Sequence, residues 1–227
     1  MSNNRNFVAV DWRSGADRLY FFFKNTNCYS RFDLGNNKVP SGYPCSLTGH
    51  WKGFDQAAEN LNFGFTTTAP SWNGGNDTLW LFYETDDKAF VCEFSQKSDR
   101  AISTQDLEQS RWAMLLPYFY SIVGVMWHES TSDKESYWFL LNDGHYLTYD
   151  LYSKVLKRLP LAGSPWAPLE QYKLRMMTAA TNDHPTFDTY FYVFLTDNTY
   201  LKYEQGAKKV YGPYTISDTS WPGLLKD

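Results

Sequence analysis

The chain has few cysteines and no long apolar run. Three cysteines in 227 residues is an odd number, so at least one thiol is free or pairs with another chain, and whether Cys28 pairs with Cys45 stays open. No apolar stretch approaches the roughly 20 residues that span a bilayer, and residues 1–6 lack the apolar segment of a signal peptide. We therefore expect a soluble protein without membrane insertion, cytoplasmic or released without a visible signal peptide.

Excess positive charge and catalytic motifs are missing as well. A formal net charge of −4 and a pI near 5.6 argue against nucleic-acid binding, which depends on concentrated lysine and arginine. The sequence has no glycine-rich phosphate loop, Gly-x-Ser-x-Gly, His-Glu-x-x-His or Cys-x-x-Cys motif. The four histidines lack the spacing of metal ligands. We expect neither an enzyme nor a metal site built from side chains.

Aromatic residues are abundant, at 19% of the chain, and they recur in a repeated pattern. Aromatic side chains favour half-buried β-strands. A strand, a turn of Asn, Asp, Thr or Gly, and a second strand occur four times, at residues 19–33, 79–94, 137–150 and 189–204. A short strand with small residues precedes each pair, at residues 7–12, 62–66, 122–127 and 175–180.

A tryptophan closes each repeat, and a short helical turn is expected before it. Trp51, Trp112, Trp166 and Trp221 are separated by 61, 54 and 55 residues. We interpret these tryptophans as wedges between repeats. Four small antiparallel sheets packed radially make a β-propeller. We therefore predict an all-β, four-bladed propeller in one domain, each blade a four-stranded antiparallel sheet, with blades at residues 7–60, 61–121, 122–173 and 174–227.

Particular residues in the first and last repeats resemble the hemopexin repeat. They are the run from Phe21 to Asp33 with Gly42-Tyr-Pro and Trp51, and Tyr200-Leu-Lys-Tyr-Glu with Val210-Tyr-Gly-Pro and Trp221-Pro-Gly. The resemblance covers almost the whole chain and implies a hemopexin-like propeller. The layout is similar to single-propeller proteins of the plant albumin-2 type and to microbial and fungal proteins with this fold.

Two features of that family are missing here. The acidic residue that the family often places on each innermost strand is replaced, at Ala9, Gly64, Gly124 and Met177, so a cation in the central channel would rest on backbone carbonyls. No cysteine near either end can tie the first blade to the last, so packing of residues 7–12 and of the Trp221 segment must close the ring. A heme is a further alternative, but the family's heme site lies between two propellers and would require a homodimer.

The loops between the first and second strands of each blade are the predicted ligand surface. The longest, residues 66–78, places Trp72 among Gly, Asn and Ser, where it has no evident core to fill. An aromatic face with polar neighbours suits a sugar, so we expect a lectin that binds glycans or another small polar ligand. The candidate ligand-binding residues are Trp72, Asn73, Arg13, Asp17, His128, Glu129, Asn182, Asp183 and His184.

Two other functions stay open on the sequence. One is a hemopexin-type storage or stress protein that binds heme or a polyamine, the latter through acidic turns at Asp86-Asp87 and Asp143. The other is a protein-interaction module.

Overall fold

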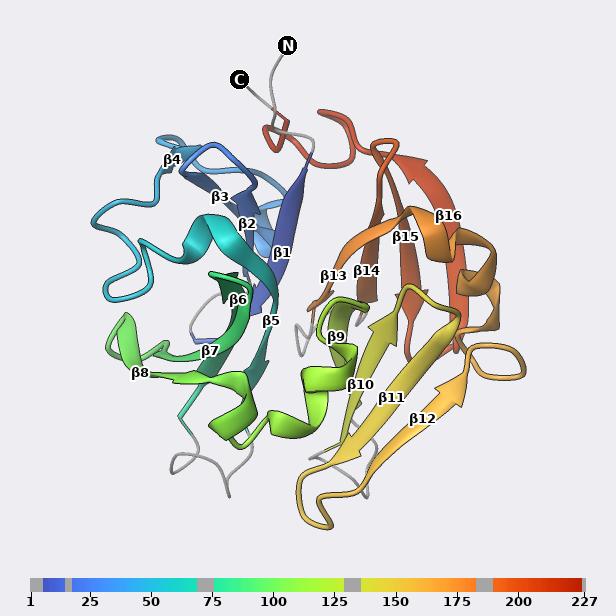
Figure 1. Ribbon diagram of the computed structural model, residues 1–227. Helices are drawn as coiled ribbons and strands as arrows, with labels where there is room; N and C mark the ends of the chain where they lie inside the picture. Colours follow the sequence, from blue (N-terminus) through green and yellow to red (C-terminus); the bar gives the residue numbers. More distant parts are fainter. Residues whose placement is uncertain (1–5, 15–17, 69–75, 129–135, 183–189, 226–227) are drawn as a thin grey trace.

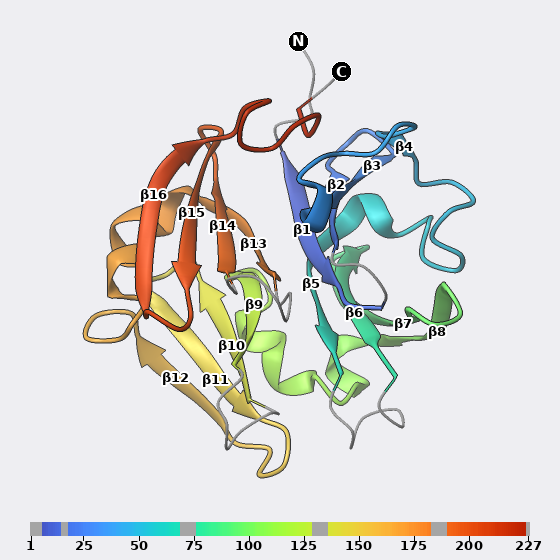
Figure 2. The same cartoon turned by 180° about the vertical axis from the view of Figure 1, so that it is seen from behind.

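A computed structural model describes residues 6–14, 18–68, 76–128, 136–182 and 190–225, and these residues are mostly β-strand (Figures 1 and 2). They form four consecutive units of four strands. Unit 1 holds β1 (Phe7–Trp12), β2 (Arg18–Phe23), β3 (Cys28–Asp33) and β4 (Cys45–Ser46). Unit 2 holds β5 (Leu61–Thr67), β6 (Thr78–Thr85), β7 (Lys88–Ser95) and β8 (Arg100–Asp106). Unit 3 holds β9 (Ile122–His128), β10 (Ser136–Leu141), β11 (His145–Asp150) and β12 (Leu156–Pro160). Unit 4 holds β13 (Met176–Asn182), β14 (Tyr190–Leu195), β15 (Thr199–Glu204) and β16 (Lys209–Thr215).

Within each unit, strands that follow one another in the chain are antiparallel neighbours. Units 1 and 2 are separate four-stranded sheets, whereas a parallel bridge between Gly124 and Ala179 joins units 3 and 4 into one eight-stranded sheet. No sheet among the described strands closes on itself. The prediction of an all-β chain of four-stranded antiparallel units is confirmed.

The first strands of the four units, the inner strands β1, β5, β9 and β13, lie next to one another. β1 contacts both β5 and β13, and β9 contacts the same two strands (Figure 1). The remaining strands of each unit extend outward from this centre (Figure 2). β1 is buried along its whole length, as expected for a strand covered on both faces.

Small residues let the inner strands approach closely. A Cβ on Gly124 would lie 2.2 Å from the carbonyl oxygen of Ala179, and one on Gly64 would lie 2.8 Å from Cγ1 of Val10. Real Cβ atoms do not approach other atoms so closely, so the backbones would have to separate. The small residues noted in the sequence are thus explained by packing at the centre.

Replacing Gly124 with alanine is expected to lower the free energy of unfolding by about 1–3 kcal/mol, because the new methyl overlaps the backbone of β13. The matched control is Gly206→Ala, where no atom lies within 4 Å of the added Cβ. Urea denaturation of both variants measures the difference. Equal stability of the two would contradict the close approach of β9 and β13.

The buried apolar side chains in the described part of the chain form four clusters, and each lies between two units. They join units 1 and 2, units 2 and 3, units 3 and 4, and units 4 and 1. A repeat tryptophan packs in every one: Trp51 against Tyr20 and Phe94, Trp112 against Trp80 and Tyr149, Trp166 against Trp138 and Tyr203, and Trp221 against Tyr192 and Phe32. The interpretation of these residues as wedges is confirmed.

The ends of the chain pack together without a disulfide, as expected. Phe7 meets Phe194 edge to face at 5.3 Å, and the Val39 N–H donates to the Pro222 carbonyl at 3.0 Å. Cys28 and Cys45 are free thiols. Cys28 lies opposite Ser46 while Cys45 lies opposite Tyr29. Neighbouring residues of a strand point to opposite faces, so the two thiols do not face each other.

Short 3₁₀ helices lie between the units and once within unit 1, and their positions agree with the prediction only in part. The sequence predicts a short helical turn before each of these tryptophans, most clearly within residues 103–112, and η4 (Leu107–Gln109) is such a turn before Trp112, while residues 103–106 complete β8. The longer helices η5 (Ala113–Tyr118) and η6 (Ala167–Arg175) begin directly after Trp112 and Trp166. The described residues also include η1 (Leu34–Asn36), between β3 and β4, and η2 (Ala58–Asn60), before β5. The tryptophan therefore starts two of these helices instead of ending them.

Candidate functional site

Most of the predicted ligand-binding residues lie outside the described residues. This applies to Asp17, Trp72, Asn73, Glu129, Asp183 and His184. His128 is the last residue of β9. The predicted role of these residues stays a prediction. Arg13 and Asn182 are described with their side chains, and they have different surroundings.

Arg13 follows β1 and is held by residues of three units. Its side chain is only 6% exposed, and its Nε lies 3.2 Å from Oδ2 of Asp11. The guanidinium also donates to the Thr68 hydroxyl at 3.3 Å and stacks 4.3 Å from the centroid of the Trp127 ring. A buried guanidinium needs such partners. These contacts account for the burial of Arg13 without a ligand.

A hydrogen-bond network around Asp11 joins units 1 and 2. The Thr66 N–H donates to Oδ1 of Asp11 at 3.0 Å, and the Thr66 hydroxyl donates to the Asp11 carbonyl at 3.1 Å. Gln96 donates from Nε2 to the same hydroxyl, and its Oε1 accepts from the Arg13 and Ser14 backbone N–H groups at 2.9 and 2.8 Å. All five residues therefore have structural partners.

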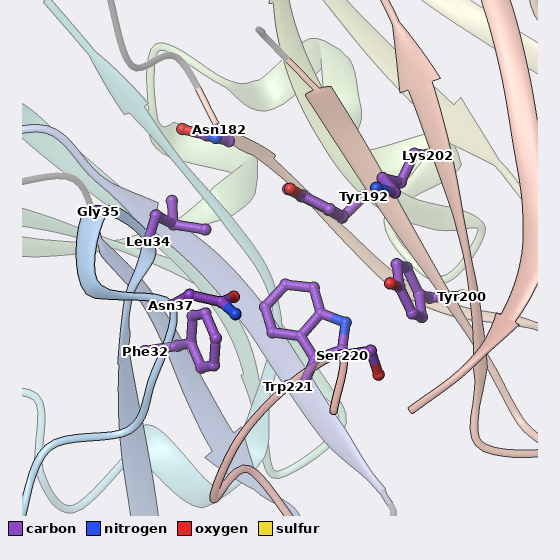
Figure 3. Close-up of a pocket in the computed structure, with 10 residues that line it drawn as sticks. All are labelled: Phe32, Leu34, Gly35, Asn37, Asn182, Tyr192, Tyr200, Lys202, Ser220 and Trp221. Carbon is purple, nitrogen blue, oxygen red and sulfur yellow. The ribbon is translucent and has the colours of Figure 1, made fainter. Parts of the chain in front are cut away.

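Asn182 instead lines a cavity between units 4 and 1, which we call the junction cavity (Figure 3). The cavity measures about 170 Å³. Unit 4 and the segment after it supply Asn182, Tyr192, Tyr200, Lys202, Ser220 and Trp221, and unit 1 with η1 and the residue after it supplies Phe32, Leu34, Gly35 and Asn37. A drug-sized site is usually at least about 300 Å³, so this cavity suits a single ring.

Aromatic rings form the wall of the junction cavity. Trp221 lies at 5.1 Å from Tyr192, 5.6 Å from Tyr200 and 4.7 Å from Phe32, measured between ring centroids. Figure 3 shows the indole between the tyrosines of unit 4 and Phe32 of unit 1. Because Trp221 is only 3% exposed, its packing fixes the geometry of the wall.

Polar groups with both donors and acceptors reach the same cavity. Asn37 is exposed and ends η1 in the left-handed conformation, with φ at 47°. Asn182 is 7% exposed and lies at the end of β13. The hydroxyl of Ser220 donates to the Thr215 carbonyl at 2.7 Å, which leaves its oxygen able to accept. In the described part of the chain, the residues that line the cavity include no Asp, Glu, His or Cys.

Both cavity tyrosines are protonated at neutral pH, and burial moves the pKa of each phenol further above the neutral range. Burial raises the pKa of Tyr192, with a smaller upward effect of Tyr200, while a hydrogen bond from Asn182 lowers that pKa. Burial also raises the pKa of Tyr200, and nearby Trp221 and Ser220 lower it. For both phenols the upward effect prevails, so each stays a neutral hydroxyl that can donate or accept.

The sequence predicts that most of the residues lining the junction cavity belong to the core. Tyr192, Tyr200 and Trp221 recur in the repeat, and recurrence was read as packing. One sequence position nevertheless distinguishes unit 4 from the other units. Lys202 pairs with Tyr192, and the matching positions of the other units hold Arg31, Glu93 and Thr148. Such a variable polar position beside a constant aromatic one marks a surface that differs between units.

Within the described ranges, no group of three His, Cys, Asp or Glu side chains is placed to hold a metal ion. No helix found there is long and apolar enough to cross a membrane. A scan against protein-family models and a search of curated proteins found no match to this chain.

Proposed function

We propose that this chain is a non-enzymatic carbohydrate-binding protein and that its four units are the blades of a hemopexin-like propeller. The ring of contacts among the inner strands supports the propeller, as does the apolar cluster between every pair of neighbouring units. In this architecture units 4 and 1 meet as first and last blades, and the junction cavity lies where the chain closes.

The junction cavity is the observation that carries the sugar-binding function. A sugar ring presents weakly positive C–H groups on its faces and hydroxyls around its edge. Aromatic faces carry a negative quadrupole that attracts such C–H groups, and the Trp221 and Tyr192 rings provide them. Asn37, Asn182 and the tyrosine hydroxyls provide hydrogen bonds for the edge. A few placed polar groups on an aromatic wall are typical of small-ligand sites.

A variant of Asn37 tests this site with little effect on folding. Asn37→Gly removes the amide but keeps a residue that tolerates the left-handed backbone. We expect a loss of sugar affinity of about three- to tenfold, which corresponds to one hydrogen bond. Asn198→Gly is the matched control, because Asn198 also has a positive φ of 57° but does not line the cavity.

A glycan array with the unmodified chain identifies the sugar, and isothermal titration then compares the variants. If no glycan binds, the carbohydrate function is wrong. If Asn198→Gly weakens binding as much as Asn37→Gly, the sugar binds elsewhere than in the junction cavity.

A polyamine is the second candidate ligand, and it would bind at a different place. Glu59, Glu84, Asp86 and Asp87 line a depression that also contains Lys24. Several carboxylates favour a polycation. Titration with spermine tests this candidate, and a Glu84→Gln variant should weaken that binding while leaving sugar binding unchanged. Hemin titration, followed by the Soret band, tests the heme alternative.

A further inference from the structure

One wall of the junction cavity carries a fixed positive charge. The Lys202 ammonium lies 5.0 Å from the ring centroid of Tyr190 and 5.4 Å from that of Tyr214. Both distances are within the range of cation–π attraction. Lys202 is half-buried on β15 and its two ring contacts restrict the side chain. The charge is therefore held beside the cavity before any ligand arrives.

No carboxylate among the described residues forms an ion pair with Lys202. Glu204, two residues further along β15, accepts a hydrogen bond from the Tyr211 hydroxyl at 2.8 Å instead. The cross-strand neighbours of Lys202 are Tyr192 and Tyr211, which are both neutral. The described residues that line the cavity also include no acidic side chain, so among them Lys202 contributes a positive charge that no lining carboxylate offsets, although the whole chain has a net charge of −4.

A buried hydrogen-bond donor beside the cavity also favours a ligand that carries hydrogen-bond acceptors. The indole Nε1–H of Trp221 is turned toward Tyr200 and Ser220 (Figure 3), close enough to lower the Tyr200 pKa, but forms no hydrogen bond of normal geometry. Trp166 has the same feature at the next junction, where Thr148 stands at the position of Lys202. The combination of lysine, cavity and unpaired donor thus distinguishes the junction of units 4 and 1.

We propose that the junction cavity selects an acidic sugar, one that carries a carboxylate or a sulfate group, with the anionic group at Lys202 and the ring on the aromatic wall. This inference rests on the proposed carbohydrate function and names its ligand class. A charge-assisted hydrogen bond is about twice as strong as a neutral one, so Lys202 would dominate the selection between an acidic sugar and its neutral counterpart.

Three small glycosides that differ at one carbon test the selection: methyl glucoside, methyl glucuronide and methyl glucoside 6-sulfate. We expect the unmodified chain to bind at least one acidic glycoside roughly tenfold or more tightly than the neutral one. The preferred acidic member identifies carboxylate or sulfate as the recognised group. The preference should weaken as salt is raised from 50 to 500 mM, because screening reduces the attraction to Lys202.

Lys202→Met keeps an aliphatic side chain between the two tyrosines and removes the charge. We expect it to lower the affinity for the preferred acidic glycoside by roughly tenfold or more and to lower the affinity for methyl glucoside by a much smaller factor, so that the preference for the acidic glycoside is lost. Lys209→Met is the matched control, because Lys209 also lies over a tyrosine ring, that of Tyr211 at 4.9 Å, but does not line the cavity. It should bind all three glycosides like the unmodified chain.

The outcomes separate this inference from the proposed function. Equal affinity of the unmodified chain for acidic and neutral glycosides would overturn the acidic selection but keep the carbohydrate function. A preference that survives in Lys202→Met, or is lost in Lys209→Met, would also overturn it. Failure of every glycoside and of the glycan array would overturn both.

Discussion

Replacing Trp221 with alanine is expected to lower the free energy of unfolding by about 3–5 kcal/mol and to abolish sugar binding in a chain that still folds. Trp221 is buried and its ring contacts Phe21 and Phe32 of unit 1 as well as Tyr192, Phe194 and Tyr200 of unit 4. Alanine leaves a void where these units meet and removes part of the aromatic wall of the junction cavity. Typical domains have 5–15 kcal/mol of stability, so a folded population is expected to remain.

Trp166→Ala is the matched control that separates the loss of stability from the loss of sugar binding. Trp166 occupies the same repeat position, is fully buried and packs between units 3 and 4, away from the junction cavity. We expect a similar loss of stability in urea denaturation, with sugar binding retained in isothermal titration. A loss below 1 kcal/mol in Trp221→Ala would contradict its role as a wedge. Equal loss of binding in both variants would show that binding depends on global stability and not on this cavity.

The repeat made the strands and the wedges predictable from the sequence. A tryptophan that recurs every 54 to 61 residues, beside an aromatic strand pair, has the same neighbours in each unit. Hairpin turns were equally predictable, because Asn25, Asp86, Asp87 and Asn198 adopt the positive φ that these residue types tolerate. The wedges and the hairpin turns depend on short stretches of sequence, and similar stretches recur in each unit.

The junction cavity could not be predicted in the same way. Its walls come from residues 32–37, from Asn182 and from residues 192–221, so it exists only once the chain has brought units 1 and 4 together. A comparison of equivalent positions within the units does not show which residues of unit 1 face unit 4. Asn182 was nevertheless among the predicted residues, because it ends an inner strand where a ligand loop was expected.

The sequence predicts the helical turn before Trp112 but not the residue at which it begins. Residues 103–106 belong to the edge strand β8, with Ser103 opposite Glu93 and Gln105 opposite Val91. Pairing with β7 decided their conformation, and the polar sequence by itself did not distinguish an exposed edge strand from a helix.

Replacing Arg13 with methionine is expected to lower the free energy of unfolding by about 3–5 kcal/mol, because it leaves the buried carboxylate of Asp11 without its cation. The stacking of the guanidinium on Trp127 and the hydrogen bond to Thr68 are lost with it. Arg158→Met is the matched control: its guanidinium also pairs with an aspartate, Asp143 at 2.8 Å, but is 41% exposed, and an exposed pair contributes about 0–1 kcal/mol.

The same variant decides whether Arg13 has a structural role or binds the ligand. The sequence predicts that it is one of the ligand-binding residues. If its contacts with units 1, 2 and 3 are its whole role, sugar affinity of the folded Arg13→Met chain equals that of the unmodified chain. Adding Asp11→Ala should then recover part of the lost stability, because removing both charges costs less than leaving one buried and unpaired. A loss of sugar affinity that the double variant does not restore would instead assign Arg13 to the ligand, and would place a binding surface at the carboxyl ends of the inner strands.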